Sequence, residues 1–401
     1  MALCSEIQQC RLCQHTDLGS LVDLGAQASW TLPDPLPLEL VQCRACGGVQ
    51  LRHTVDRHSL FTDYAYRSGM NDWMRAYLIR LAQQLSAYIS WQVDDVVLDI
   101  GANDGTFLRA CQPEVPVRRV GFEPADNVVP MTAYEQIPDF FSAASYWQYC
   151  DRPARLITSI AMFYDLDDPV AFAREVQEVL ADDGVWVVEV QNAERLLIDG
   201  IYDTVLHEHL VYYTPGTLVD TLQRAGLVVT KLERSMSNGG SLRAYVRHTG
   251  RSVQVDSLSP LCLSQGLAHR VRYQQARLRD LLEGYAARGQ SVYGYGASTK
   301  GAVVLQACGI DQRLCQVIAD KDPAKWGQHM PGSGIPICSE EAMRASQPDA
   351  LLVLPWAFAD TFLAREQALF EAGTDFLIPF PLPAVRHQTP RPLNKEIPCA
   401  L

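Results

Sequence analysis

The stretch DDVVLDIGANDGTFLRAC, residues 94–111, decides the fold of this 401-residue chain. Residues 96–100 are a short apolar run, rich in β-branched side chains and bounded by glycine, which predicts a buried strand. Residues 101–105 form a tight turn with a glycine at each end, and residues 107–111 begin a helix. A strand, a glycine loop and a helix in this order predict the first unit of an α/β sheet.

The glycine loop lacks the G-x-G-x-x-G pattern of a dinucleotide-binding turn, and it places acids where a pyrophosphate would be repelled. The next predicted strand, RRVGFE, ends at Glu123, where a carboxylate can accept hydrogen bonds from both hydroxyls of a ribose. These features favour S-adenosylmethionine over NAD; the alternative is a structural turn with incidental acids. The candidate cofactor residues are Asp99, Gly101, Asn103, Asp104, Gly105 and Glu123.

The α/β pattern continues along the chain and then begins again. Residues 154–166 indicate a strand and a loop, residues 168–180 have helical spacing, and residues 183–190 indicate another strand. This alternation predicts a parallel, doubly wound sheet that binds ligands at the carboxyl ends of its strands. Amphipathic spacing predicts one helix within 71–92 before the first strand and a connector helix over 266–289.

The stretch QSVYGYGASTKGAVVLQACGI, residues 290–310, repeats the order of strand, glycine loop and helix, and the strand after it ends at Asp320. Ser298 and Lys300 lie at the start of the predicted helix, where the backbone dipoles favour an anion. A diphosphate is therefore a sensible ligand; the alternative is a degenerate repeat that binds nothing.

Four of the twelve cysteines form two C-x2-C pairs about thirty residues apart, separated in part by a proline-rich loop over 32–38. Four thiolates can close a tetrahedral zinc site with no open position, which predicts a structural metal. His15 and His53 are weaker candidate ligands, and Cys4 lies outside the spacing. The predicted ligands are Cys10, Cys13, Cys43 and Cys46.

The segment YDTVLHEHLVYYT, residues 202–214, concentrates titratable side chains. Its spacing is not that of a helical zinc site, whereas a histidine held beside a carboxylate suits proton abstraction near neutral pH. The alternative is a pair of hydrogen-bonded core histidines. Arg243, in the following predicted strand, could meet an anion. The candidate catalytic residues are His207, Glu208, His209 and Tyr212.

Charge and hydropathy exclude several classes of protein. A formal net charge of −12 argues against a general nucleic-acid-binding protein. The sequence contains no uninterrupted apolar run of about 18 or more residues, so we expect no membrane span. The first residues lack the basic and apolar regions of a signal peptide, so we expect a cytoplasmic protein with reduced cysteines.

Taken in order, these motifs resemble the nucleotide-sugar C-methyltransferases of antibiotic and polysaccharide deoxysugar pathways over almost the whole chain. CRLCQ and CRACGGVQL resemble their zinc-binding module, and YAYRSGMN the segment that leads into their methyltransferase domain. LDIGANDGTFL and GFEPADN resemble their cofactor motifs, and YDTVLHEHLVYYT and NGGSLRAYV their active-site motifs. YGASTKGAVVLQACGI and DPAKWG resemble their C-terminal domain.

The resemblance implies an α/β protein of three domains. These are a zinc-binding N-terminal module over 1–65, a class I Rossmann-like methyltransferase domain over 66–250, and a second Rossmann-like, substrate-binding domain over 251–401. It adds Asn127 to the cofactor site. It also adds Tyr66 and Asn71 to the candidate substrate residues Arg243, Ser298 and Lys300.

The implied reaction methylates a ring carbon next to the ketone of a 4-keto-6-deoxy nucleotide sugar, with S-adenosylmethionine as donor. His209 matches the family's base, which removes the α-proton to form an enolate. Leu206 and Asp165 stand where the family has tyrosine and histidine. C3 is therefore the default position, and methylation at C5, or of a keto compound that is not a sugar, stays open. The rival functions are O- or N-methylation of another small molecule and a non-catalytic, zinc-containing scaffold. We expect a monomer or a small homo-oligomer.

Overall fold

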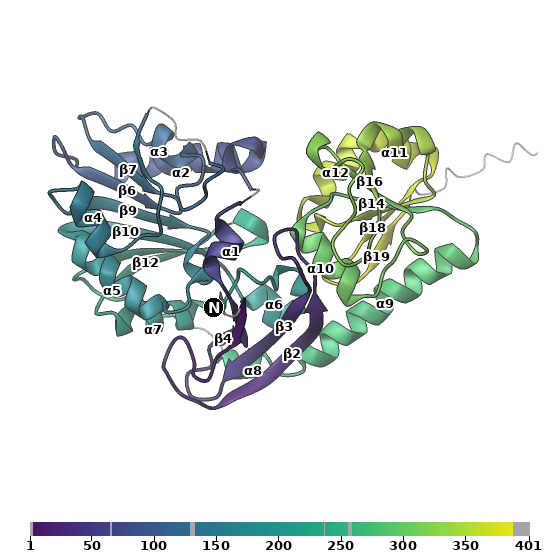
Figure 1. The fold of residues 1–401 in the computed structure, drawn as a ribbon, viewed down its shortest axis with the longest axis horizontal. Helices are drawn as coiled ribbons and strands as arrows, with labels where there is room; N and C mark the ends of the chain where they lie inside the picture. Colours follow the sequence, from purple (N-terminus) through teal and green to yellow (C-terminus); the bar gives the residue numbers. More distant parts are fainter. Residues whose placement is uncertain (1–2, 65, 129–132, 236, 256–258, 388–401) are drawn as a thin grey trace, which may run out of the picture. The chain divides into compact units, whose positions relative to one another are not determined.

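The computed structural model describes residues 3–64, 66–128, 133–235, 237–255 and 259–387. The chain folds as two compact units, Met1–His269 and Arg270–Leu401 (Figure 1). No helix within the described ranges is both long and apolar enough to cross a membrane.

The first unit is built on a seven-stranded sheet. Five strands, from β10 to β8, run parallel, whereas β13 is antiparallel to both β10 and β12. The predicted parallel sheet is therefore confirmed, with an antiparallel pair added at one edge. In order across the sheet the strands are β12 (Val228–Ser235), β13 (Ser241–Arg247), β10 (Leu180–Gln191), β9 (Ala154–Ile160), β6 (Val96–Ile100), β7 (Arg118–Phe122) and β8 (Glu135–Ile137).

Helices cover both faces of this sheet. Val185 and Val187 of β10 pack in one core cluster with Leu81 and Leu85, which come from the helix predicted within 71–92. Trp186 lies between the two valines and points to the opposite face, because successive side chains of a strand alternate. The helices of this unit include α2 (Asp72–Tyr88), α3 (Thr106–Ala110), α4 (Ala143–Tyr149), α5 (Pro169–Val179) and α7 (Pro215–Arg224).

The N-terminal residues form a second, four-stranded sheet in the order β11-β4-β3-β2. Three of its strands come from the first 51 residues, but β11 comes from the segment that follows the H-E-H motif. β3 begins at Leu36, inside the predicted proline-rich loop. The strands are β2 (Leu18–Gln27), β3 (Leu36–Cys43), β4 (Val49–Leu51) and β11 (Val211–Tyr212), and a separate pair joins β1 (Cys4–Glu6) to β5 (His53–Val55).

This shared sheet places the N-terminal module and the central α/β part in one unit, and the predicted boundaries at residues 65 and 250 stay predictions. Short helices connect the strands of the unit. They are α1 (Arg57–Phe61), η1 (Ser68–Met70), η2 (Phe163–Asp165), α6 (Glu194–Asp199), η3 (Tyr202–Thr204), η4 (Ser237–Gly239) and α8 (Pro260–Leu263).

The second unit is a six-stranded sheet with α9 (Leu267–Ala287), the predicted connector helix, leading into it. Its first five strands are parallel, and Tyr295 and Phe376 are buried in its core. In sheet order the strands are β16 (Ile337–Ser339), β15 (Val317–Asp320), β14 (Val292–Tyr295), β17 (Ala350–Val353), β18 (Asp375–Ile378) and the antiparallel β19 (Ala384–Arg386). The remaining helices are α10 (Thr299–Ala307), α11 (Glu340–Ser346), α12 (Ala359–Arg365), α13 (Gln367–Ala372), η5 (Pro323–Lys325) and η6 (Trp356–Phe358).

Candidate active site and cysteine cluster

The glycine loop lies at the carboxyl end of β6 and depends on left-handed backbone. Gly101, Asn103 and Gly105 have φ of 75°, 49° and 70°. At Gly105 a Cβ would lie 2.1 Å from the ring of Tyr134, so a larger residue would displace this ring as well as strain the turn. The loop therefore needs glycine both for its conformation and for space.

Glu123 follows β7 and is anchored to the glycine loop. One carboxylate oxygen accepts a hydrogen bond from the Asn103 amide at 2.7 Å, and the other accepts from the Ala125 amide at 3.0 Å. The residue is 6% exposed, and burial raises the pKa of its carboxyl. Because a carboxylate offers about four lone-pair sites, two acceptor sites remain, and the predicted contact with a ribose stays a prediction.

Asn103 and Asp104 hold the segment that precedes α2. Asn103 Oδ1 accepts from the Ser68 amide at 2.9 Å, and Asp104 Oδ2 accepts from the Gly69 amide at 2.7 Å. Asn103 Nδ2 donates to the Tyr66 carbonyl at 3.0 Å. Residues 66–69 thus lie across the loop, a function of the Asn103 and Asp104 side chains that spacing did not reveal. Their contact with the cofactor stays a prediction.

The other residues implied at this end of the sheet also hold loops together. Asn127 donates from Nδ2 to the Asp63 carboxylate, and its own carbonyl accepts from Arg67 Nη2 at 2.9 Å. Asn71 caps α2, accepting from the Met74 amide at 3.2 Å. The predicted cofactor role of Asn127 and the substrate role of Asn71 are untested by these contacts.

Asp99 sits within β6 beneath the loop and is 4% exposed. It accepts a hydrogen bond from Thr158 Oγ1 at 2.6 Å. Burial raises the pKa of Asp99 to about 7, and the Thr158 bond only partly opposes this effect. Asp99 therefore braces β6 against β9, while its predicted cofactor contact stays a prediction.

His209 lies between two loops that follow strands of the main sheet. Its Nδ1 lies 3.0 Å from the Thr204 carbonyl oxygen, and its ring meets the Tyr164 ring edge to face at a centroid distance of 4.5 Å. Since a carbonyl can only accept, Nδ1 carries the hydrogen and Nε2 carries the lone pair. The ring is thus fixed in both tautomer and orientation.

His207 has a different environment, although it is only two residues away. It is 4% exposed, and its Nε2 donates to the Leu36 carbonyl of β3 at 3.1 Å. Burial lowers the pKa of His207, which favours the neutral ring. Tyr212 is also buried, with its hydroxyl 3.4 Å from the Thr204 carbonyl. The environment of His207 thus fits a hydrogen-bonded core histidine, whereas the environment of His209 is compatible with a base.

Two carboxyl groups and a phenol lie near His209. Burial, and after it the charge of Glu208, raises the pKa of Asp165 well above its ordinary value. Asp165 Oδ1 is buried and has no hydrogen-bond partner among the described residues. Burial likewise raises the pKa of Glu208 and that of Tyr164. Burial around the histidine therefore favours the protonated forms of Asp165, Glu208 and Tyr164.

Arg243 lies in β13 with its charge matched inside the sheet. It is 7% exposed, and its Nε donates to Glu189 at 2.8 Å. Burial is the largest single effect and acts to lower the pKa of Arg243, but the charges of Glu189 and Tyr77 and the hydrogen bonds to both together outweigh burial and raise this pKa. Tyr77 also accepts a hydrogen bond from this guanidinium. The predicted contact of Arg243 with a substrate anion remains untested.

The four paired cysteines converge in the N-terminal module. All four Sγ atoms lie within 4.8 Å of one another. Cys10 and Cys46 are 3.7 Å apart at sulfur, and Cys13 and Cys43 are 3.6 Å apart. Zn–S bonds of about 2.3 Å in a tetrahedron give S–S edges of about 3.8 Å. The donor set therefore fits zinc, and neither His15 nor His53 belongs to this cluster.

In the second unit the glycine loop after β14 repeats the arrangement of the first. Asp320, at the end of β15, accepts from the Ala297 amide at 2.7 Å, as Glu123 does from its own loop. Ser298 caps α10 by accepting from the Gly301 amide at 3.0 Å. Lys300 lies in the first turn of that helix. Backbone amides and a cation thus gather at this terminus.

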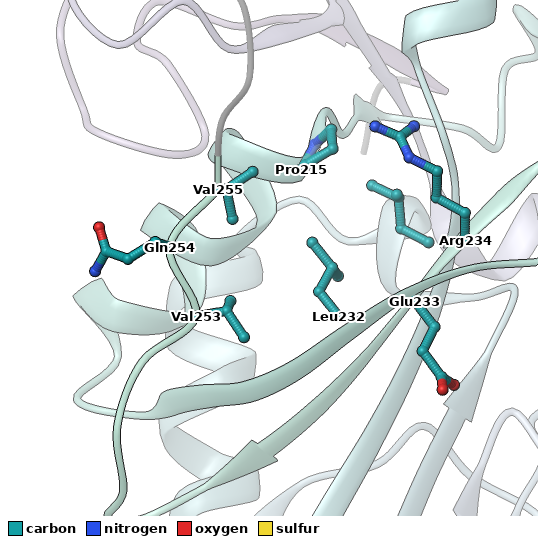
Figure 2. A pocket seen from close by; sticks show the side chains of 8 residues that line it. Pro215, Leu232, Glu233, Arg234, Val253, Gln254 and Val255 are labelled. Atoms are coloured by element: carbon teal, nitrogen blue, oxygen red, sulfur yellow. The ribbon is translucent and has the colours of Figure 1, made fainter.

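A cavity of about 240 Å³ lies at the outer edge of the main sheet. It is bordered by β12, by Pro215 at the start of α7 and by residues 253–255, and no predicted site residue lines it. Figure 2 shows the charged ends of Glu233 and Arg234 pointing in opposite directions beside the apolar side chain of Leu232. The cavity is separate in its residues from the site around His209.

The sheet order and the acid-anchored glycine loop define the class: the chain is an S-adenosylmethionine-dependent methyltransferase of class I. Residues 70–232 match the family model "Methyltransferase domain", and residues 236–381 match "C-methyltransferase C-terminal domain". The chain is 30% identical to the C-methyltransferase NovU of Streptomyces niveus, over 94% of this chain and 97% of that protein. The chain belongs to this family of C-methyltransferases, so the predicted class and family are confirmed.

Solved structures resemble part of the chain. A methyltransferase from Clostridium acetobutylicum covers 45% of this chain and 93% of its own, at 12% identity and a TM-score of 0.32. The cyclopropane synthase MmaA2 from Mycobacterium tuberculosis covers 43% and 71%, at 16% identity and a TM-score of 0.32.

Proposed function

We propose that this C-methyltransferase acts on the carbon next to the ketone of a 4-keto-deoxy nucleotide sugar, with His209 as the base. The observation that carries the proposal is the fixed ring of His209, whose Nδ1 donates to the Thr204 carbonyl at 3.0 Å. The carbon next to a ketone becomes nucleophilic only when its proton leaves. C-methylation at this position therefore requires a base in addition to the methyl donor. Family membership favours C-methylation over the O-methyl, N-methyl and scaffold alternatives.

In this mechanism Nε2 of His209 takes the α-proton, and the Thr204 carbonyl stabilises the imidazolium that forms. Charge then develops on the ketone oxygen. Asp165 and Tyr164, whose raised pKa values favour their protonated forms, can donate hydrogen bonds to that oxygen. Glu208 supplies a second carboxyl beside them. S-adenosylmethionine, when bound, supplies the electrophilic methyl group.

The cofactor site in this proposal is the carboxyl edge of β6 and β7. Glu123 receives the ribose hydroxyls on the acceptor sites that Asn103 and Ala125 leave open. The left-handed loop between Gly101 and Gly105 wraps the methionine end. Asp99, Asp104 and Asn127 complete the set that we assign to this site.

The substrate residues in this proposal are Tyr66, Asn71, Arg243, Ser298 and Lys300. Ser298 and Lys300 suit the diphosphate, because they add a hydroxyl and a cation to amides at a helix N-terminus. C3 is the default position of methylation, and C5 is the alternative because Leu206 and Asp165 depart from the family pattern.

We further propose that Cys10, Cys13, Cys43 and Cys46 hold one structural zinc ion. Backbone and side-chain donors support thiolates there: the Leu12 amide lies 3.4 Å from Cys10 Sγ, and Gln50 Nε2 lies 3.1 Å from the same sulfur. Four protein ligands leave no position for substrate, so the ion would act on folding and not on chemistry.

The substrate is tested by incubating the enzyme with methyl-labelled S-adenosylmethionine and a panel of 4-keto nucleotide sugars. We expect NMR of the product to show the label on the carbon next to the ketone. Without donor, the enzyme should exchange the substrate α-proton with deuterated water. A label on oxygen or nitrogen, or transfer to none of the sugars, would contradict the proposal.

Glu123→Ala should weaken binding of S-adenosylhomocysteine by about 10- to 100-fold, because a hydrogen bond to a charged group contributes about 1.5–3 kcal/mol. The Asn103 amide would lose its acceptor at the same time. Calorimetry measures the affinity, and Asp126→Asn, an exposed acid of the same loop, serves as the control. Equal affinity of Glu123→Ala and wild type would refute the ribose contact.

A further inference from the structure

The two cysteine pairs share the sequence Cys-Arg-x-Cys, but the fold treats their arginines in opposite ways. Arg44, in the second pair, has a side chain that is 67% exposed, and it meets Asp17 at 3.5 Å on the surface. Arg11, in the first pair, has a side chain that is only 2% exposed. Burying a guanidinium is unfavourable unless its donors are satisfied. The contacts of Arg11 therefore need an explanation that the cysteine cluster alone does not supply.

The Arg11 guanidinium makes four hydrogen bonds, of which the longest joins Nη2 to the His53 carbonyl at 3.5 Å. Nη1 donates to the Leu51 carbonyl at 2.5 Å, and Nη2 donates to Thr54 Oγ1 at 2.6 Å. Nε donates to Asp167 Oδ1 at 3.1 Å, and Thr54 Oγ1 donates to the same carboxylate oxygen at 3.0 Å. Arg11 thus links the N-terminal module to Asp167, which lies 156 residues away in the chain.

The contact between Arg11 and Leu51 leads to the strand that follows His209. The Leu51 amide donates to the Leu210 carbonyl at 2.9 Å, directly after that histidine. Gln50 of β4 pairs with Val211 of β11 in the same ladder. The Gln50 side chain accepts from the Arg11 amide at 2.9 Å. The first cysteine pair is therefore bonded to the strand that fixes one side of the histidine loop.

The Asp167 contact leads to the loop that follows Tyr164. Asp167 lies two residues after η2, which carries Tyr164. The Tyr164 ring is the one that packs against the His209 ring, at a centroid distance of 4.5 Å. The side chain of Asp167 is 66% exposed, and its bonds to Arg11 and to Thr54, which Arg11 also contacts, tie this loop to the module.

We propose that Arg11 is a positioning residue for proton abstraction: from the first cysteine pair it holds in register the strand that follows His209 and the loop that follows Tyr164, whose ring packs on His209. The inference rests on the proposed role of His209. Arg11 does not touch the reacting atoms and acts through the segments that it links. Its removal should therefore move the base and leave the cofactor site on β6 and β7 intact.

Arg11→Ala should lower kcat by about 10²-fold, since a displacement of about 1 Å has effects of this size. Its affinity for S-adenosylhomocysteine and its zinc content should match those of wild type. Exchange of the substrate α-proton should fall in the same proportion as kcat. The matched control is Arg44→Ala, which occupies the same position of the second Cys-Arg-x-Cys pair and should keep wild-type turnover.

Arg11→Ala removes a buried side chain and can destabilise the fold. Two variants of Asp167, whose side chain is exposed, therefore test the same hydrogen bond with less effect on packing. Asp167→Ala should reproduce the loss of kcat with little change in KM. Asp167→Asn should restore most of it, because its amide oxygen can still accept from Arg11 and Thr54. A residue that only stabilised the fold would lower the melting temperature without this difference between alanine and asparagine.

Hydrogen exchange followed by mass spectrometry separates this inference from the proposed substrate. In Arg11→Ala and Asp167→Ala, the amides of residues 204–213 should exchange at least about tenfold faster than in wild type or Arg44→Ala. Equal exchange in the Arg11 and Arg44 variants would overturn the positioning role. If the wild type methylates none of the sugars, the substrate proposal fails, and the exchange rates still decide the role of Arg11.

Discussion

His209→Ala should lose about 10²–10⁴-fold in turnover while it still binds cofactor and substrate, because a general base contributes this much to a rate. The Thr204 carbonyl holds Nδ1 and leaves Nε2 as the basic atom, so no other atom of the ring can replace it. Exchange of the substrate α-proton in deuterated water should vanish together with turnover. NMR measures the exchange, and calorimetry with S-adenosylhomocysteine measures the retained binding.

The matched control is His207→Ala. His207 donates to the Leu36 carbonyl in a buried site, so we expect this variant to lose stability and to keep the exchange chemistry. Near-normal turnover of His209→Ala together with an inactive but folded His207→Ala would move the base to His207. Near-normal turnover of both would leave Tyr212, Tyr213 or Asp165 as candidates.

If the four cysteines hold the zinc ion that we propose, its removal should unfold the N-terminal module. Structural zinc contributes about 10–16 kcal/mol of apparent binding energy in small domains, and most of this is folding energy. Cys43→Ser should therefore purify without stoichiometric zinc and melt at a lower temperature. Its affinity for S-adenosylhomocysteine should stay nearly intact, because Glu123 and the glycine loop bond to neighbours outside the cysteine cluster.

Metal analysis, thermal melting and calorimetry measure these three effects. Cys4→Ser is the matched control, because Cys4 lies outside the cluster of four sulfurs. Freshly purified wild-type protein without zinc would refute the metal site. A Cys43→Ser variant as stable as wild type would show that the module folds without the ion. If Arg11 positions His209, Cys43→Ser should also lose turnover, whereas Cys4→Ser should not.

Local sequence determined the elements of this protein and the class of its chemistry. The strand over 96–100 is β6 (Val96–Ile100) as predicted, and the helix after the loop is α3 (Thr106–Ala110). Glycine spacing, β-branched runs and helical periodicity act over a few residues, so they can be read from the chain directly. The doubled C-x2-C is equally local, and its four sulfurs do converge.

Tertiary structure alone decided which of two similar residues carries a contact. His207 and His209 share one motif, yet β3 receives the first and the Tyr164 ring packs on the second. Arg11 and Arg44 share the sequence Cys-Arg-x-Cys, yet one is buried and the other is exposed. Side-chain burial depends on which distant segment packs against the residue, and no periodicity within the motif contains that information. The pairing of β4 with β11 supplies it, because this pairing brings the cysteine module against the histidine loop.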